Sequence, residues 1–224
     1  RMEPIRVVHS SDVLCVWAYV GQVRMDRLSQ EFPSEVAVEY RYVSVFGNAR
    51  EKLEERWRDK GGLAAYAEHV GSVVAKFDHV RLSPEAWTRV APTSSMPAHL
   101  LLCAIRLLER AGLAAAGAQT ATAWQVREAF FRDGRDVSDM EVLRELAREA
   151  GLDVGALDAH LASGRAHAEL ARDLDLAREQ DIRVSPTLTL NDGRQRLSGN
   201  VGYRTIAANV REILEKPVEE ASWC

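Results

Sequence analysis

The residues of this chain best suited to chemistry surround one cysteine, Cys15, within the segment Ser11–Gly21. Cys15 follows a short apolar run, Ile5–Val8, that is typical of a strand, and precedes residues 16–32, which have the apolar spacing of a helix. The start of a helix offers unpaired N–H groups and the positive end of the helix dipole, which favour an anion. We therefore expect Cys15 to be a nucleophilic thiolate with a lowered pKa, rather than the small buried apolar residue that free cysteine often is.

The turn after Cys15 contains only one thiol, because the third residue after it is Ala18. In a Cys-x-x-Cys enzyme the second thiolate attacks the mixed disulfide and releases the product, and a methyl group cannot do this. Val16 completes the turn, and Trp17 either packs in the core or contacts a substrate beside the thiol. Cys15 could still exchange through glutathione or another small thiol, or through Cys224 as a distant resolving thiol.

Other polar residues are candidates for the same site. Asp12 is more simply a loop or helix cap than an acid–base group. His99 is a candidate to face Cys15 and stabilise its thiolate, although a histidine on one helix face is more often packed or solvated. The histidines show no metal-ligand spacing, so no metal site is expected. The charge-rich runs 50–60 and 165–180 are most simply solvated helix faces.

A second segment, Val184-Ser185-Pro186, lies just before a predicted strand that begins at Thr187. Thioredoxin-like proteins place a cis-proline at this position, opposite the cysteine, and the segment resembles theirs. We therefore predict that the Ser185–Pro186 bond is cis, although only about 5 to 6% of such bonds in folded proteins are.

The coarse pattern predicts strands at both ends of the chain and helices between them. The segments are a strand at 36–43, helices at 98–111 and 165–180, a hairpin at 187–197 that turns at Asp192-Gly193, and a helix at 203–214. Ser138–Glu141 reads as a capping box in which the serine caps the next helix, and Asp153 can cap the one after it. This order predicts an α/β domain built from residues 1–47 and 181–224, interrupted by an all-helical insertion at 48–180.

Composition narrows the classes of partner. A formal net charge of -4 and a pI near 5.9 give no broad attraction for phosphate backbones, so no nucleic acid is expected. No leader pattern and no apolar run long enough to span a bilayer are evident, so we expect a cytoplasmic protein with no membrane partner. Three cysteines without regular spacing, among them Cys103, form neither a disulfide framework nor a zinc pattern.

The motifs together resemble the FrnE-like members of the DsbA family. Ser11–Gly21 is similar to their Ser-Asp-x-x-Cys-Pro-Trp-Cys-Tyr-x-Gly, Pro97–Leu102 to their Ala-His-Arg-Leu-Leu helix, Ala129–Asp139 to their Phe-x-x-Gly-Arg-Asp-Ile-x-Asp segment, and Val184–Gly199 to their Val-Pro-Thr hairpin. The resemblance implies a thioredoxin-like fold with a large helical insertion and a thiol–disulfide oxidoreductase. It implies no required cofactor, and a small-molecule thiol or disulfide as substrate. It leaves open whether the chain forms a homodimer.

The chain departs from that family at Val16 and Ala18, and a turn with one nucleophile is closer to two related groups. These are the 2-hydroxychromene-2-carboxylate isomerases and the kappa-class glutathione transferases, in which one hydroxyl residue stands where Cys15 does. The resemblance to them implies glutathione, with Ser198, Gly199 and Asn200 near its γ-glutamyl end, although their acidic residue there is not evident. Three hypotheses remain: a single-thiol oxidoreductase, a glutathione-dependent isomerase or transferase, and a redox-inactive binding protein.

Overall fold

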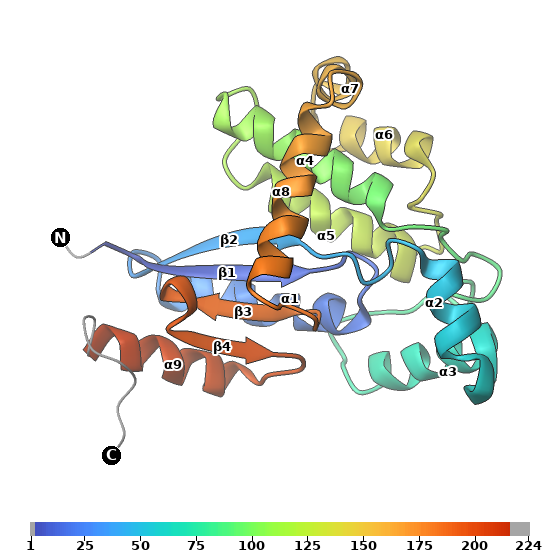
Figure 1. Ribbon diagram of the computed structural model, residues 1–224, viewed down its shortest axis with the longest axis horizontal. Coiled ribbons are helices and arrows are strands. Elements are labelled where there is room, and N and C mark those ends of the chain that lie inside the picture. Colours follow the sequence, from blue (N-terminus) through green and yellow to red (C-terminus); the bar gives the residue numbers. More distant parts are fainter. Residues whose placement is uncertain (1–2, 216–224) are drawn as a thin grey trace.

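The computed structural model describes residues 3–215, in which both ends of the chain contribute strands to one sheet. The strand order is β2-β1-β3-β4, with β2 parallel to β1 and the remaining neighbours antiparallel (Figure 1). The strands are β1 (Ile5–Ser11), β2 (Val36–Tyr42), β3 (Thr187–Leu190) and β4 (Gln195–Ser198). The fold is thioredoxin-like, as the sequence predicts.

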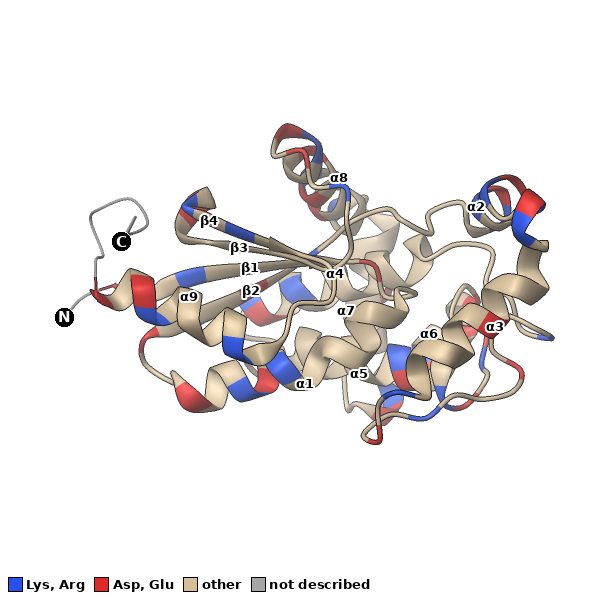
Figure 2. Cartoon of the chain, turned by 90° about the horizontal axis from the view of Figure 1, so that it is seen from below, with Lys and Arg blue, Asp and Glu red and all other residues tan. Residues whose placement is uncertain are grey.

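Two helices cover one face of the sheet. They are α1 (Val16–Glu31) and α9 (Tyr203–Glu215), and Figure 2 shows both on the side opposite α8. The core between them and the sheet is apolar, because alternate strand residues point to the same face. It contains Ile5, Val7, Leu188 and Leu190 from the sheet and Met25, Leu28, Ile206 and Val210 from the helices. The other face carries charged side chains, among them Arg6 and Glu39, which are ion-paired at 2.9 Å.

The segment between β2 and β3 is helical throughout its regular structure. Its helices are α2 (Ala49–Arg56), the 3-10 helix η1 (Arg58–Lys60), α3 (Gly62–Val74), α4 (Met96–Arg110), α5 (Ala118–Phe131), α6 (Met140–Glu149), α7 (Val154–Ala162) and α8 (Arg165–Glu179). Another 3-10 helix, η2 (Asn191–Gly193), forms the hairpin turn. The exact division of the chain at residues 48 and 180 stays a prediction.

One predicted helix start is wrong by a residue. The side chain that caps α6 belongs to Asp139, which accepts a hydrogen bond from the backbone N–H of Glu141. Ser138 instead donates both its backbone N–H and its hydroxyl to the side chain of Asp136, two residues earlier in the chain, so its hydroxyl does not cap the helix. Asp153 does cap α7, as predicted, by accepting from the N–H of Ala156.

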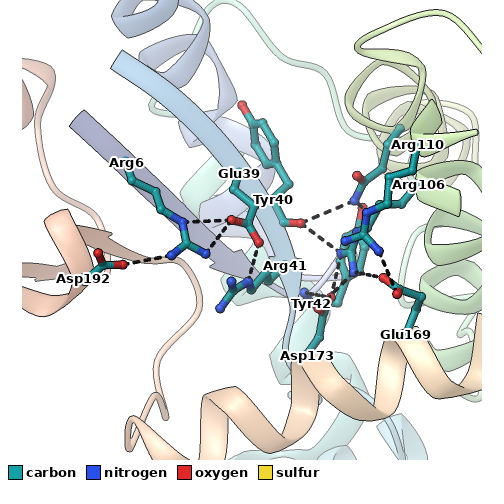
Figure 3. Close-up of polar contacts among 11 residues, drawn as sticks. Arg6, Glu39, Tyr40, Arg41, Tyr42, Arg106, Arg110, Glu169, Asp173 and Asp192 are labelled. Atoms are coloured by element: carbon teal, nitrogen blue, oxygen red, sulfur yellow. Dashed lines mark hydrogen bonds and ion pairs between the residues drawn. The ribbon is translucent and has the colours of Figure 1, made fainter. Parts of the chain in front are cut away.

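The helical segment seals the exposed edge of β2. Arg106 on α4 donates to the carbonyl of Tyr40, while Asp173 on α8 accepts from the N–H of Tyr42 (Figure 3). Arg106 and Asp173 also pair with each other at 2.7 Å in a buried position. An edge strand otherwise presents unpaired backbone groups to other chains. The ion pair therefore satisfies the backbone of β2 and ties α4 and α8 to the sheet.

A second core fills the helical segment and extends to the turn between β1 and α1. Val13, Leu14, Cys15 and Val16 belong to it, together with buried residues from α3, α4 and α5 such as Val70, Leu102 and Phe130. The cysteine turn is therefore packed by the helical segment, not by the core beneath the sheet.

Candidate active site around Cys15

Cys15 lies at the junction where β1 ends and α1 begins, as predicted. It is the N-cap residue of α1, and its backbone is extended there. Its sulfur donates a hydrogen bond to the carbonyl oxygen of Ser185 at 3.2 Å, and the Ser185 hydroxyl accepts from the N–H of Asp12. The Ser185–Pro186 peptide bond is cis, as predicted. Two segments far apart in the sequence therefore meet at the thiol.

The electrostatic expectation for Cys15 is wrong. The side chain is buried, and this burial raises the pKa of the Cys15 thiol despite the opposing effect of its hydrogen bonds to Ser185 and to the N–H groups of Ala18 and Trp17. The free-energy cost of removing the thiolate from water is larger here than the stabilisation that it gains from the first turn of the helix. The negative charge of Asp12 also raises the pKa. The resting form of Cys15 is therefore the thiol.

Asp12 organises the turn from a fully buried position. One carboxylate oxygen accepts from the N–H of Leu14, and the other accepts from the N–H groups of Val45 and Phe46 and from the hydroxyl of Ser95. These four donors come from the turn itself, the segment after β2 and the start of α4. Asp12 acts as a cap for three segments at once, which agrees with the capping role expected from the sequence.

His99 is brought to the turn, but not to the sulfur. It is fully buried, stacks on Tyr42 at 4.8 Å between ring centroids, and accepts at Nε2 the hydrogen bond of the Val13 N–H. Burial, and then the charge of Arg127, lower the pKa of His99, while Asp12 opposes this. The imidazole is therefore neutral and supports the backbone of the turn. A thiolate-stabilising imidazolium or a direct substrate contact, both considered from the sequence, does not fit this placement.

The other predicted residues of the turn divide between core and surface. Val16 and Ala18 are fully packed, whereas Trp17 is half-buried against the helical core. Val184, beside the cis bond, exposes 46% of its surface. An exposed apolar residue at the cis-proline loop is a surface that a substrate could cover.

The segment Ser198-Gly199-Asn200 also reaches the cis-proline loop. The N–H of Gly199 donates to the carbonyl of Pro186 at 2.8 Å, which needs the left-handed backbone that Gly199 adopts with φ 81°. Ser198 and Asn200 are exposed on either side of it. The segment therefore lies beside the proline, and its predicted contact with glutathione stays a prediction.

A cleft of about 470 Å³ opens beside the cysteine turn. One wall is the segment after β2, whose Val45 N–H binds Asp12, and the other leads into the cis-proline loop. The cleft is lined by Val43, Ser44, Val45, Leu174, Ala177, Arg178, Asp181, Ile182 and Arg183. Its volume lies within the usual range of small-molecule sites.

Three residues that the sequence did not single out as functional lie around Cys15. Lys52 on α2, Tyr66 on α3 and Arg127 on α5 all lie within electrostatic range of its sulfur. Lys52 belongs to a run expected to be solvated, yet it is half-buried with its ammonium 4.5 Å from the centre of the Phe46 ring. No local pattern distinguishes these residues, because only the packing of three helices brings them to the turn.

Within residues 3–215, no group of three or more His, Cys, Asp or Glu side chains is arranged to hold a metal ion. In the same range, no helix combines the length and the apolar character needed to cross a membrane. The two cysteines in this range, Cys15 and Cys103, are both free. Cys224, the predicted distant resolving thiol, lies outside the described residues.

Residues 6–211 match the family model of the DSBA-like thioredoxin domain. The chain belongs to this family. In this chain the domain brings Cys15 to the cis bond between Ser185 and Pro186, and the turn after Cys15 contains no second thiol.

Solved structures that resemble this DSBA-like domain come from more than one class of protein. A putative protein disulfide isomerase from Nitrosomonas europaea has a TM-score of 0.76 at 15% identity, with 96% of this chain and 99% of that one covered. A 2-hydroxychromene-2-carboxylate isomerase has a TM-score of 0.66 at 18% identity, covering 97% and 100%. The cytosolic disulfide reductase DsbM from Pseudomonas aeruginosa, determined with GSH, has a TM-score of 0.62 at 18% identity, covering 95% and 98%. At these identities the likeness concerns the fold.

Proposed function

We propose that this protein is a thiol–disulfide oxidoreductase that works with a single active-site thiol, Cys15. The observation that carries the proposal is the hydrogen bond from the Cys15 sulfur to the carbonyl of Ser185, directly before the cis bond to Pro186. Val184, the residue before Ser185, is exposed, and a cleft of ligand size is lined by Val45, whose N–H binds Asp12 in the cysteine turn.

The proposed reaction is an exchange through one mixed disulfide. Cys15 loses its proton, and the thiolate attacks one sulfur of a small disulfide, so that a Cys15–substrate disulfide forms and the other half leaves as a thiolate. Because Ala18 has no sulfur, the mixed disulfide waits for a second small thiol from solution, such as glutathione. The thiolate of that molecule attacks the substrate sulfur, forms a new disulfide with it and returns Cys15 as a thiolate, which takes up a proton.

A glutathione-dependent isomerase or transferase is the second candidate. The turn with one nucleophile favours it, as does the exposed segment Ser198–Asn200, which lies against Pro186 and offers polar groups to a tripeptide. In this version Cys15 positions the glutathione sulfur and forms no disulfide. Either reaction needs no bound cofactor beyond the small thiol, and we place both in the cytoplasm, where such thiols are reduced.

The first test is whether Cys15 forms a mixed disulfide. The protein is mixed with hydroxyethyl disulfide and quenched with acid, and its intact mass is measured by mass spectrometry. In a separate assay, turnover of the disulfide is followed with glutathione in excess. We expect an adduct and turnover from the wild type, neither from Cys15→Ser, and both from Cys103→Ser, whose thiol is fully buried on α4. Comparing Cys224→Ser with the wild type shows whether Cys224 acts as a resolving thiol.

The pH dependence gives a second test. Since burial raises the pKa of Cys15, we expect the rate of adduct formation to rise with pH through neutrality, by about tenfold per unit while the thiol form dominates. A rate that is already constant from pH 6 upward would contradict this. Glutathione binding without any adduct would favour the isomerase or transferase, and absence of both would leave a redox-inactive binding protein.

A further inference from the structure

Arg127 is a buried cation that has almost no polar partners. It lies on α5, exposes only 2% of its surface, and donates from Nη2 to the hydroxyl of Ser11 at 2.9 Å. Its Nε atom is buried without a hydrogen-bond partner, and no carboxylate within residues 3–215 comes close enough to pair with it. A buried guanidinium is costly unless an opposite charge compensates it. The position therefore needs a source of negative charge.

The groups that face Arg127 come from three elements and the cysteine turn. β1 contributes His9, β2 contributes Tyr40 and Tyr42, and α4 contributes His99. Burial lowers the pKa of each histidine, to about 3 for His9, and raises the pKa of each tyrosine, so all four are uncharged near neutrality.

The turn contributes the remaining two groups, Asp12 and Cys15. The carboxylate of Asp12 is already bound by four other donors. Cys15 is thus the group near Arg127 whose charge state is free to change during the proposed reaction.

We infer that Arg127 is a positioning residue whose fixed charge, held at the end of β1 by its hydrogen bond to Ser11, favours the thiolate of Cys15 over its thiol. The inference rests on the proposed function. It explains how a thiol in so buried a place can become a nucleophile: when Cys15 releases its proton to solvent, the new negative charge meets a cation that has no carboxylate of its own. The helix dipole alone does not overcome the burial.

Other charged or titratable groups around Cys15 must be separated from Arg127. They are Asp12 on the turn, Lys52 on α2 and Tyr66 on α3. Lys52 is a cation too, but it is half-buried and partly hydrated, whereas Arg127 is enclosed. Because screening by water weakens a charge, Arg127 should have the larger effect.

The test measures the rate of Cys15 alkylation by iodoacetamide from pH 6 to pH 10 in the full chain, with Cys224 replaced by serine in every variant. We expect Arg127→Met to raise the pKa seen in this profile by about one unit, which is about a tenfold slower reaction at neutral pH. Arg127→Lys keeps the charge and should keep the profile within about 0.3 units. Lys52→Met should shift it less than Arg127→Met.

Arg106→Met is the matched control, since it also removes a buried guanidinium of the helical segment, but one that faces Cys103 and Asp173 rather than Cys15. In its folded form, verified by circular dichroism at each pH, its alkylation profile should match the wild type. If folded Arg127→Met keeps the wild-type profile, or if Arg127→Lys shifts it as much as the methionine does, the inference is overturned and Arg127 is structural only.

Should Arg127→Met fail to fold, Ser11→Asp replaces it. This variant gives Arg127 the carboxylate that it lacks, and we expect a raised pKa of Cys15 relative to Ser11→Asn, while equal profiles for the two would overturn the inference. Alkylation needs no disulfide turnover. A wild type that never forms a mixed disulfide would therefore refute the proposed oxidoreductase without deciding the role of Arg127.

Discussion

Two buried arginines of the helical segment have opposite surroundings. Arg106 pairs with Asp173 and Glu169, caps the carbonyl of Tyr40 and completes a network that closes the edge of β2 (Figure 3). Arg127 has Ser11 alone and an unpartnered Nε. A fully satisfied buried charge holds elements together, whereas an under-satisfied one can respond when a neighbour changes its own charge. Arg106 therefore belongs to the network that anchors the helical segment to β2, whereas Arg127 lies in the region where we propose that Cys15 reacts.

The largest effect should come from breaking the anchor. We expect Arg106→Met to lower the free energy of unfolding by about 3 to 5 kcal/mol, because it leaves the Asp173 carboxylate buried and unpaired. Denaturation by urea measures it. Adding Asp173→Leu should recover most of the loss, although the N–H of Tyr42 then loses its acceptor. A loss below 1 kcal/mol for the single variant would show that the network contributes little to anchoring.

Asp12→Asn should have the next largest effect, on the reactive side of the comparison. An amide in place of the carboxylate turns an NH₂ group toward the N–H donors of Val45 and Phe46 or toward that of Leu14, and about 2 to 3 kcal/mol of stability should be lost. The control Ser95→Ala removes one neutral donor and should cost about 1 kcal/mol. Equal losses for the two variants would mean that the charge of Asp12 does not organise the turn.

The smallest effect, about 1.4 kcal/mol per histidine for one pH unit, concerns mild acid. Because the folded-state pKa values of His9 and His99 are lowered, the unfolded chain binds their protons first. The contribution of these neutral histidines to the free energy of unfolding should therefore be fully present above about pH 6.5. It should be lost as the pH falls toward the folded-state pKa, which is about 3 for His9, by up to about 1.4 kcal/mol per pH unit for each histidine.

Replacing His9 with phenylalanine should flatten this slope, measured by urea denaturation at several pH values. The control His167→Gln changes an exposed side chain on α8 and should leave the slope as it is. If His9→Phe loses stability with acid as steeply as the wild type, the region around Arg127 is not what makes the fold sensitive to acid.

Local patterns were enough for most elements and for the meeting of the two key segments. Alternation marked β2, turn residues marked the hairpin, and the proline before β3 marked the cis bond. Sequence patterns did not predict the role of a side chain correctly where its partner lies outside the pattern. Asp173 was expected on a solvated face, but its partner Arg106 lies on another helix. Ser138 fits a capping box by spacing, yet Asp136 takes its hydroxyl.

The residue types in the cysteine turn are enough to define which chemistry is open to this protein. A sulfur at Cys15 and none at Ala18 allow exchange through one thiol and exclude a two-thiol cycle in the turn, whatever the fold. The charge state of that thiol, in contrast, depends on how the folded chain surrounds it. Burial raises its pKa, and so does the charge of Asp12, since desolvation and electrostatic fields depend on distances through space and not on spacing along the chain.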